Sequence, residues 1–234
     1  MKRTLYFILG LLGFLALLCS IAAAQATHEG LMKQGFLQFS QTGHLGVPAS
    51  RYGEYAHAVC QYLDGKTDVP AVPSPESGEA VNAFSDKENR HLADVRGLIG
   101  GLKWMRWASG GLVIAVLAAL YIIKRHDRAR LLADVLRGFA AAALFLLAAG
   151  LALLIWGLIN FDGLFWTFHR AVFTNDLWLL DPRTDLLMAL MPLPFFLWYA
   201  GEMLKSMAPV LAIMVLALIG WKKSAITQKE KSAS

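Results

Sequence analysis

Residues 139–159 read FAAAALFLLAAGLALLIWGLI, a stretch without a charged side chain. About 20 apolar residues in a helix span the roughly 30 Å hydrocarbon core of a bilayer. Three further stretches share this character: 5–24, 107–123, and 207–221 with an upstream extension. The chain has 56% hydrophobic residues and a mean hydropathy of +0.48, which is too apolar for an ordinary soluble domain. We therefore expect an integral membrane protein.

Basic side chains gather at one end of each apolar stretch. They precede the first, link the second to the third and follow the fourth: Lys2, Arg3, Lys124, Arg125, Arg128, Arg130, Arg137, Lys222, Lys223, Lys229 and Lys231. Because cytoplasmic loops carry such an excess of Lys and Arg, both termini are expected in the cytoplasm and the two long connections, 25–106 and 160–206, outside it. These residues account for most of the net charge of +5 and suit contact with membrane phospholipid. No nucleic-acid partner is expected.

The expected fold class is membrane α-helical, a four-TM-helix bundle with a small extracytoplasmic α+β cap formed mainly by the loop between TM helices 1 and 2. The predicted boundaries are TM helix 1 at 1–24, an extracytoplasmic domain at 25–102 ending in the helix of His91, TM helix 2 at 103–123, a basic cytoplasmic turn at 124–137, TM helix 3 at 138–159, an extracytoplasmic segment with His169 at 160–194, TM helix 4 at 195–223 and a cytoplasmic tail at 224–234. Residues 1–24 also fit a cleavable signal peptide, because small residues follow the apolar run. Both alternatives send the next loop outward.

Local patterns in the first outer connection predict four short elements. Alternation over 36–40 suits a short strand, whereas apolar residues over 52–63 recur at helical spacing before a turn at Asp64-Gly65. Prolines within 69–78 predict an irregular loop. Ser85 to Glu88 form a capping-box pattern, which predicts a helix that leads into the second span.

The second outer connection is rich in aromatic residues. We expect a turn at 160–163, a short helix over 164–173, and a helix start where Asp181 is the N-cap and Pro182 takes the first helical position. Pro192 and Pro194 interrupt the segment that follows.

The motifs of several common chemistries are absent from the sequence. It has no His-Glu-x-x-His pair, no Gly-x-Ser-x-Gly elbow, no phosphate-binding glycine loop and no cysteine cluster, so neither a metal nor another cofactor is expected. A transporter would place ionisable groups at bilayer depth, and the nearest candidates, Glu202 and Lys205, are expected high in the last span. Cys19 in the first span and Cys60 in the outer loop are not expected to form a disulfide.

Two motifs stand out, one in each outer connection. Residues 168–185 read FHRAVFTNDLWLLDPRTD and are followed by Met191-Pro192 and Phe195-Phe196, while residues 88–95 read ENRHLADV. With the layout of spans and basic turn, these motifs resemble the lipoprotein intramolecular transacylase family. The resemblance covers the whole chain.

The resemblance implies an enzyme of the bacterial cytoplasmic membrane. Members of the family move the sn-2 acyl chain of a diacylglyceryl lipoprotein to the α-amino group of its own N-terminal cysteine, which leaves a lyso-form lipoprotein. The substrate partner would be a diacylated bacterial lipoprotein. The two histidines of the family match His91 and His169.

Aminolysis of an ester needs a neutral amine, a proton acceptor and stabilisation of a tetrahedral oxyanion. We assign His169 as the general base toward the amine, and His91 as the oxyanion stabiliser or the proton donor to the departing glycerol oxygen; the roles could be reversed. Because amine and ester belong to one substrate, no acyl-enzyme is needed. The other four histidines lack such a context and are interpreted as structural: His28, His44, His57 and His126.

Several neighbouring residues are candidates for supporting or substrate-binding roles. Two acids could orient an imidazole and three arginines could bind a carbonyl or a lipid head group, although all five also suit ordinary salt bridges: Asp94, Asp181, Arg96, Arg170 and Arg183. Trp178 belongs to a group of tryptophans expected near the outer interface, which either anchor the bundle or line a groove for a lipid substrate.

Two rival functions fit the same sequence. A non-enzymatic membrane scaffold or chaperone would use its outer domain to bind a secreted partner, and it would tolerate replacement of both histidines. An acyltransferase that works between separate lipid molecules could use the same histidine pair, and only its products would distinguish it.

Overall fold

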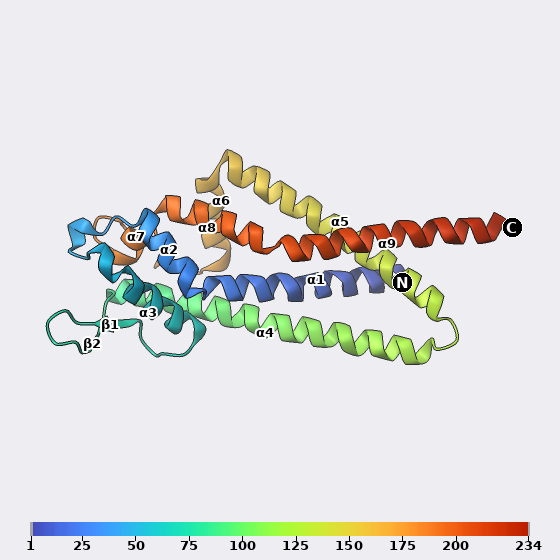
Figure 1. Cartoon of the computed structure of the whole chain (residues 1–234), viewed down its shortest axis with the longest axis horizontal. Helices are drawn as coiled ribbons and strands as arrows, with labels where there is room; N and C mark the ends of the chain where they lie inside the picture. The colour runs from blue at the N-terminus through green and yellow to red at the C-terminus, as the bar shows by residue number, and fades with distance from the viewer. Residues whose placement is uncertain (1, 234) are drawn as a thin grey trace. The chain divides into compact units, whose positions relative to one another are not determined.

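The computed structural model describes residues 2–233, with side chains described over residues 3–222, so the side chains of Lys2, Lys223, Lys229 and Lys231 lie outside the described set. The chain is mostly helical, with one short antiparallel hairpin (Figure 1). The α-helices are α1 (Lys2–Ala26), α2 (Glu29–Phe39), α3 (Tyr52–Asp64), α4 (Asp86–Ile123), α5 (Arg128–Ile159), α6 (Phe161–Val172), α7 (Leu186–Leu190), α8 (Leu193–Ser206) and α9 (Ala208–Ala233), and the strands are β1 (Ala71–Pro73) and β2 (Ala80–Asn82).

Within the described residues, three helices are long and apolar enough to cross a membrane: Arg3–Ala26, α4 and α5, with mean hydropathies of 2.5, 1.8 and 2.5 over their most apolar windows. Taken together, α8 and α9 form a fourth candidate that is broken between the two helices. These helices expose large apolar side chains, such as Ile114 at 71%. Such surfaces suit contact with lipid rather than water.

The chain divides into two compact units. Unit 1 contains the described residues up to 20, 104–166, and those from 207 onward. Small residues allow close helix packing inside it: a Cβ added to Gly138 of α5 would lie 2.3 Å from the carbonyl carbon of Tyr6 in α1. Because glycine has no side chain, the backbones of α1 and α5 can approach each other closely at this position.

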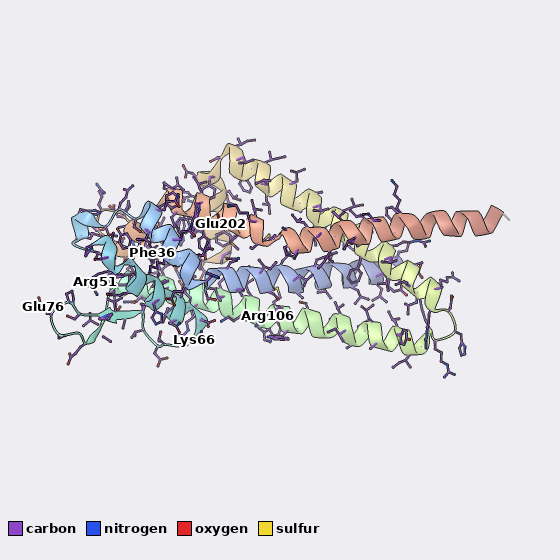
Figure 2. All side chains as sticks on the ribbon, in the orientation of Figure 1. Phe36, Arg51, Lys66, Glu76, Arg106 and Glu202 are labelled. Carbon is purple, nitrogen blue, oxygen red and sulfur yellow. The ribbon has the colours of Figure 1, made fainter. Side chains whose placement is uncertain are left out.

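Unit 2 contains residues 21–103 and 167–206 and has its own buried core. Phe36 of α2, labelled in Figure 2, is fully buried. Its ring lies edge-on to Tyr52, with centroids 6.4 Å apart, and 5.8 Å from the ring of Phe195. Helices α2, α3 and α8 therefore share one aromatic core, which supports the polar segments described below.

Several local predictions are confirmed by the structure. Helix α3 begins at Tyr52 and ends at Asp64, and Gly65 follows with a φ of 85°, where a glycine is favoured. The capping box also forms, because Ser85 N donates to Glu88 Oε2 at 2.7 Å. The helix that it starts continues without a break into the apolar part of α4. Cys19 and Cys60 are free thiols.

The predicted strand at 36–40 is wrong, because these residues end helix α2. The alternation was too short to decide the period, whereas Met32, Gly35 and Phe36 are buried at helical spacing. Pro73 is part of a strand, since β1 pairs with β2 in a hairpin that replaces much of the irregular loop expected at 69–78. A proline is compatible with such an edge strand.

Two predicted boundaries in the second outer connection are also wrong. Residues 161–163 belong to α6 rather than to a turn, and Asn160 alone separates α5 from α6, with its Oδ1 accepting from Gly163 N at 2.8 Å. Asp181 does not start a helix. Helix α7 begins after Asp185, and Asp181 instead pairs with Arg183.

Candidate active site

The first turns of α4 carry His91 on a firmly held helix end. Glu88 is only 2% exposed, and both of its carboxylate oxygens accept backbone hydrogen bonds. Oε2 accepts from Ser85 N, and Oε1 accepts from Leu187 N of α7 at 2.6 Å. Since charged acceptors make strong hydrogen bonds, Glu88 ties the start of α4 to the start of α7. His91 follows one turn later.

His91 and His169 lie together in unit 2. Their ring centroids are 6.4 Å apart, with an angle of 36° between the ring planes. Phe173 contacts both rings, at centroid distances of 5.3 Å from His91 and 5.6 Å from His169. On His169, the indole of Trp178 packs at 4.9 Å with an angle of 34°. Aromatic rings thus flank an imidazole pair that comes from α4 and α6.

His91 lies outside the apolar part of α4. The helix has 38 residues and is therefore about 57 Å long, nearly twice the thickness of the hydrocarbon core. Its charged residues all precede Trp107: Asp86, Lys87, Glu88, Arg90, Asp94, Arg96, Lys103 and Arg106. Hydrocarbon can cover only the second half of the helix.

Burial keeps the His91 imidazole neutral. The residue is 9% exposed, and the loss of solvation, assisted by repulsion from His169 and opposed by Asp94, lowers its pKa to about 4. Among the described atoms, His91 Nδ1 is buried and has no hydrogen-bond partner. Above pH 5, His91 is therefore a neutral ring.

A cavity of about 320 Å³ opens between α4 and the chain that follows α6. Its lining combines small and apolar residues with three polar ones: Ala93, Asp94, Gly97, Leu98, Val172, Phe173, Thr174 and Asn175. Asp94 Oδ2 accepts a hydrogen bond from Asn175 Nδ2 at 2.9 Å across it. Since Phe173 contacts both imidazoles, the cavity adjoins the histidine pair.

Residues 6–196 match the family model described as "Lipoprotein intramolecular transacylase Lit". The chain belongs to this family. It is therefore an acyltransferase, a lipoprotein transacylase of the membrane. None of the curated proteins matches the sequence.

Solved structures of a membrane-integral family member share the fold. The lipoprotein intramolecular transacylase Lit from Bacillus cereus has a TM-score of 0.69 and 20% identity, over 100% of this chain and 99% of that one. A variant of that protein with one histidine changed to arginine gives 0.65 and 19%, over 99% and 95%. A variant with a histidine changed to alanine gives 0.64 and 20%, over 100% and 96%. At this identity, the likeness establishes the fold alone.

Of the residues predicted for the site of this transacylase, four come together: His91, His169, Asp94 and Trp178. Asp94 contacts Asn175 rather than either imidazole through a hydrogen bond. Arg170 is exposed and follows His169 in α6.

Three other predicted site residues have partners elsewhere in the transacylase. Arg96 lies over the ring of Tyr62, with its guanidinium 4.8 Å from the centroid, and donates to the Thr67 carbonyl. The guanidinium of Arg183 donates to Asp181 at 2.7 Å, and this hydrogen bond lowers the pKa of the Asp181 carboxyl to about 2. Asp181 and Arg183 therefore form an ion pair with each other.

The four histidines interpreted as structural each contact a partner other than His91 and His169. His28 Nδ1 caps α2 by accepting from Leu31 N, and His57 Nδ1 lies 2.8 Å from a Glu29 oxygen. His44 Nε2 lies 3.1 Å from the Pro182 carbonyl oxygen, and His126 Nε2 accepts from Arg125. Over the described part of the chain, no group of three or more His, Cys, Asp or Glu side chains is arranged to hold a metal ion.

Sequence reasoning missed Phe173, Asn175 and the second partner of Glu88. Phe173 and Asn175 belong to the quoted motif, but neither residue type signals chemistry by itself. Asn in a connection is a local signal for a side-chain turn, and Asn175 Oδ1 does accept from Leu177 N at 3.1 Å. The contact of Glu88 with Leu187 had no local signal, because the two residues are 99 positions apart.

Proposed function

We propose that this transacylase moves the sn-2 acyl chain of a diacylglyceryl lipoprotein to the α-amino group of its N-terminal cysteine, which yields the lyso-form lipoprotein. Membership of the family supports the reaction class. The single observation that carries the assignment to residues is the imidazole pair, with ring centroids 6.4 Å apart beside a cavity. Because an imidazole nitrogen contacts an oxygen at about 3 Å, two rings this close can both reach one reacting carbonyl group.

In the proposed reaction, His169 is the general base for the amine and then the general acid for the departing glycerol oxygen. The cysteine nitrogen attacks the sn-2 carbonyl carbon, a C–N bond forms, and His169 accepts the proton that the nitrogen loses. When the C–O bond to glycerol breaks, the imidazolium returns this proton to the glycerol oxygen. The reaction thus consumes no net proton, and the base is regenerated in each cycle.

His91 stabilises the oxyanion in this proposal. Because buried donors without an acceptor are rarer than unpaired acceptors, we infer that the unpartnered Nδ1 is the bare nitrogen and that Nε2 carries the proton. A neutral ring with a fixed N–H is a preorganised donor for developing negative charge. Its low pKa also makes it a poor base, which favours His169 for that task.

Much of the rate enhancement would come from holding one flexible substrate molecule in a reactive conformation. Amine and ester are joined through the thioether and glycerol, so positioning replaces a bimolecular encounter. We propose that the cavity beside Asp94 and Phe173 receives part of the lipoprotein, and that Trp178 and Phe173 cover the reacting groups. Arg170, exposed beside His169, is the proposed contact for a lipid or ester oxygen. Arg96, Asp181 and Arg183 would stabilise the surrounding chain.

We further propose that four spans place this site on the outer side of a bacterial cytoplasmic membrane. The boundaries would be those predicted from the sequence, with α8 and α9 as the last span, both termini in the cytoplasm, and residues 25–102 and 160–194 outside as the cap. The basic turn at 124–137 supports this orientation. Phospholipid would surround the apolar faces, and the substrate would enter from the lipid.

A crossover experiment tests this function. The purified protein in phospholipid vesicles receives two diacylglyceryl lipopeptides: one carries different chains at sn-1 and sn-2, and the other carries the same chains in isotope-labelled form. Mass spectrometry should find each cysteine nitrogen acylated with the sn-2 chain of its own molecule. Mixed isotopes would instead identify transfer between molecules, and the absence of an N-acyl product would favour the scaffold.

A further inference from the structure

Asn175 makes three hydrogen bonds in the segment that follows α6. Its Nδ2 donates to Asp94 Oδ2 at 2.9 Å. Its Oδ1 accepts from Leu177 N at 3.1 Å, and its backbone carbonyl accepts from the indole nitrogen of Trp178 at 2.9 Å. One residue therefore connects α4 with a tight turn and with the Trp178 side chain.

Trp178 is the part of this segment that contacts the histidine pair. The indole is buried and packs on the ring of His169 at 4.9 Å. A ring packed against an imidazole restricts the rotation of that imidazole, because aromatic pairs favour particular relative orientations. The orientation of His169 thus depends on the placement of Trp178.

Building on the proposed function, we propose that the Asp94–Asn175 hydrogen bond is a latch that holds Trp178 against His169, and that Asn175 is a positioning residue for the transfer reaction. Asp94 supplies the fixed end of the latch from α4, one turn beyond His91. The latch also closes one side of the cavity that adjoins both imidazoles. Asp94 acts here as a hydrogen-bond acceptor, and its charge is not required.

A set of three variants separates the latch from a direct role of the Asp94 charge. In Asn175→Asp, two carboxylates face each other, the donor is lost, and kcat should fall at least tenfold while KM stays within threefold. In Asp94→Asn, the amide oxygen still accepts from Asn175, so this variant removes the Asp94 charge and keeps the latch. In the double variant, donor and acceptor change places, so its kcat should lie within threefold of that of Asp94→Asn.

A second readout follows His169 without requiring activity. Carbethoxylation of each histidine by diethylpyrocarbonate is measured by peptide mass spectrometry, with exposed His57 as the internal reference. The rate at His169 should rise severalfold in Asn175→Asp and stay at the wild-type value in Asp94→Asn and in the double variant. If Asn175→Asp does not fold, Asn175→Ser replaces it, because serine keeps the turn but cannot reach Asp94.

The two hypotheses fail in different ways. A wild type without N-acyl product contradicts the proposed function, while the labelling rates still test the latch. An active wild type together with an unchanged Asn175→Asp, in kcat and in labelling, overturns the latch alone. A double variant whose kcat stays at least tenfold below that of Asp94→Asn also overturns it, since exchanging donor and acceptor would then not restore the latch.

Discussion

The two halves of α4 belong to one continuous helix but face different demands. In residues 86–103, polar side chains have individual partners: Glu88 binds Leu187 N, Asp94 binds Asn175, and Lys103 forms an ion pair with Asp64. In residues 104–123, Ile114 and Ile122 are each 71% exposed. The first half is specified residue by residue, whereas the second needs only length and apolar character. The candidate active site therefore lies on the polar half of α4, before the apolar run begins.

The strongest expected effect on stability contrasts a buried leucine with an exposed isoleucine on this helix. Leu92, in the first half, is 2% exposed, so Leu92→Ala should lower the free energy of unfolding by about 2–5 kcal/mol through lost contacts and a cavity. Ile114→Ala, in the second half, should change it by less than about 0.5 kcal/mol. Thermal unfolding of both variants in detergent measures the difference, and equal losses would remove the distinction between the halves.

The neutral state of His91, in the first half of α4, predicts that the free energy of unfolding depends on pH. Its folded pKa is about 4 and its ordinary value 6.5, so the unfolded chain binds more protons between these values. The stabilisation is therefore complete above pH 6.5 and is lost as the pH falls toward 4. The loss is at most about 3.5 kcal/mol, since a difference of one in pKa corresponds to about 1.4 kcal/mol.

Comparison with His91→Gln isolates this contribution. The Tm of the wild type should fall more steeply than that of His91→Gln between pH 6.5 and 4.5, because the other histidines are common to both proteins. Parallel curves would show that His91 is not buried as a neutral ring.

Two glycines on α4 allow the role of the cavity in substrate binding to be tested. A Cβ added to Gly97 or to Gly101 would meet nothing within 4 Å, and replacing a helical glycine removes its unfavourable helix propensity of about 1 kcal/mol. Gly97 lines the cavity and Gly101 does not. Gly97→Leu should therefore lower kcat/KM about tenfold by filling the cavity, while Gly101→Leu leaves it unchanged. Equal kcat/KM values would exclude the cavity from substrate binding.

The sequence predicts those parts of the fold that depend on local or compositional rules. Apolar length identifies the spans, because the hydrocarbon core fixes the length of a helix that crosses it. The capping box at Ser85 and Glu88 is likewise read from four neighbouring residues. The motifs around His91 and His169 indicate the family, but their geometry comes from packing between two connections. Asn175 donates to Asp94 from 81 residues away, a contact without a local pattern.

The wrong predictions have a common physical origin. The alternation at 36–40 covered too few residues to separate a strand from the end of a helix. Phe36 is buried in the aromatic core as part of helix α2. Asp181 has the residue type of an N-cap, but its side chain is engaged by Arg183. Contacts of individual side chains thus overrode propensity in both places.

The central claim is that His91 and His169 carry the transfer chemistry. The most direct measurement is the rate of appearance of N-acyl cysteine in a lipopeptide, followed by mass spectrometry for the wild type, His91→Ala, His169→Ala and the matched control His44→Ala. Removing a general base or oxyanion donor costs about 10²- to 10⁴-fold, so both site variants should fall by at least 100-fold, while His44→Ala keeps the wild-type rate. Full activity in either His91→Ala or His169→Ala, with the protein inserted in the membrane, would contradict the account.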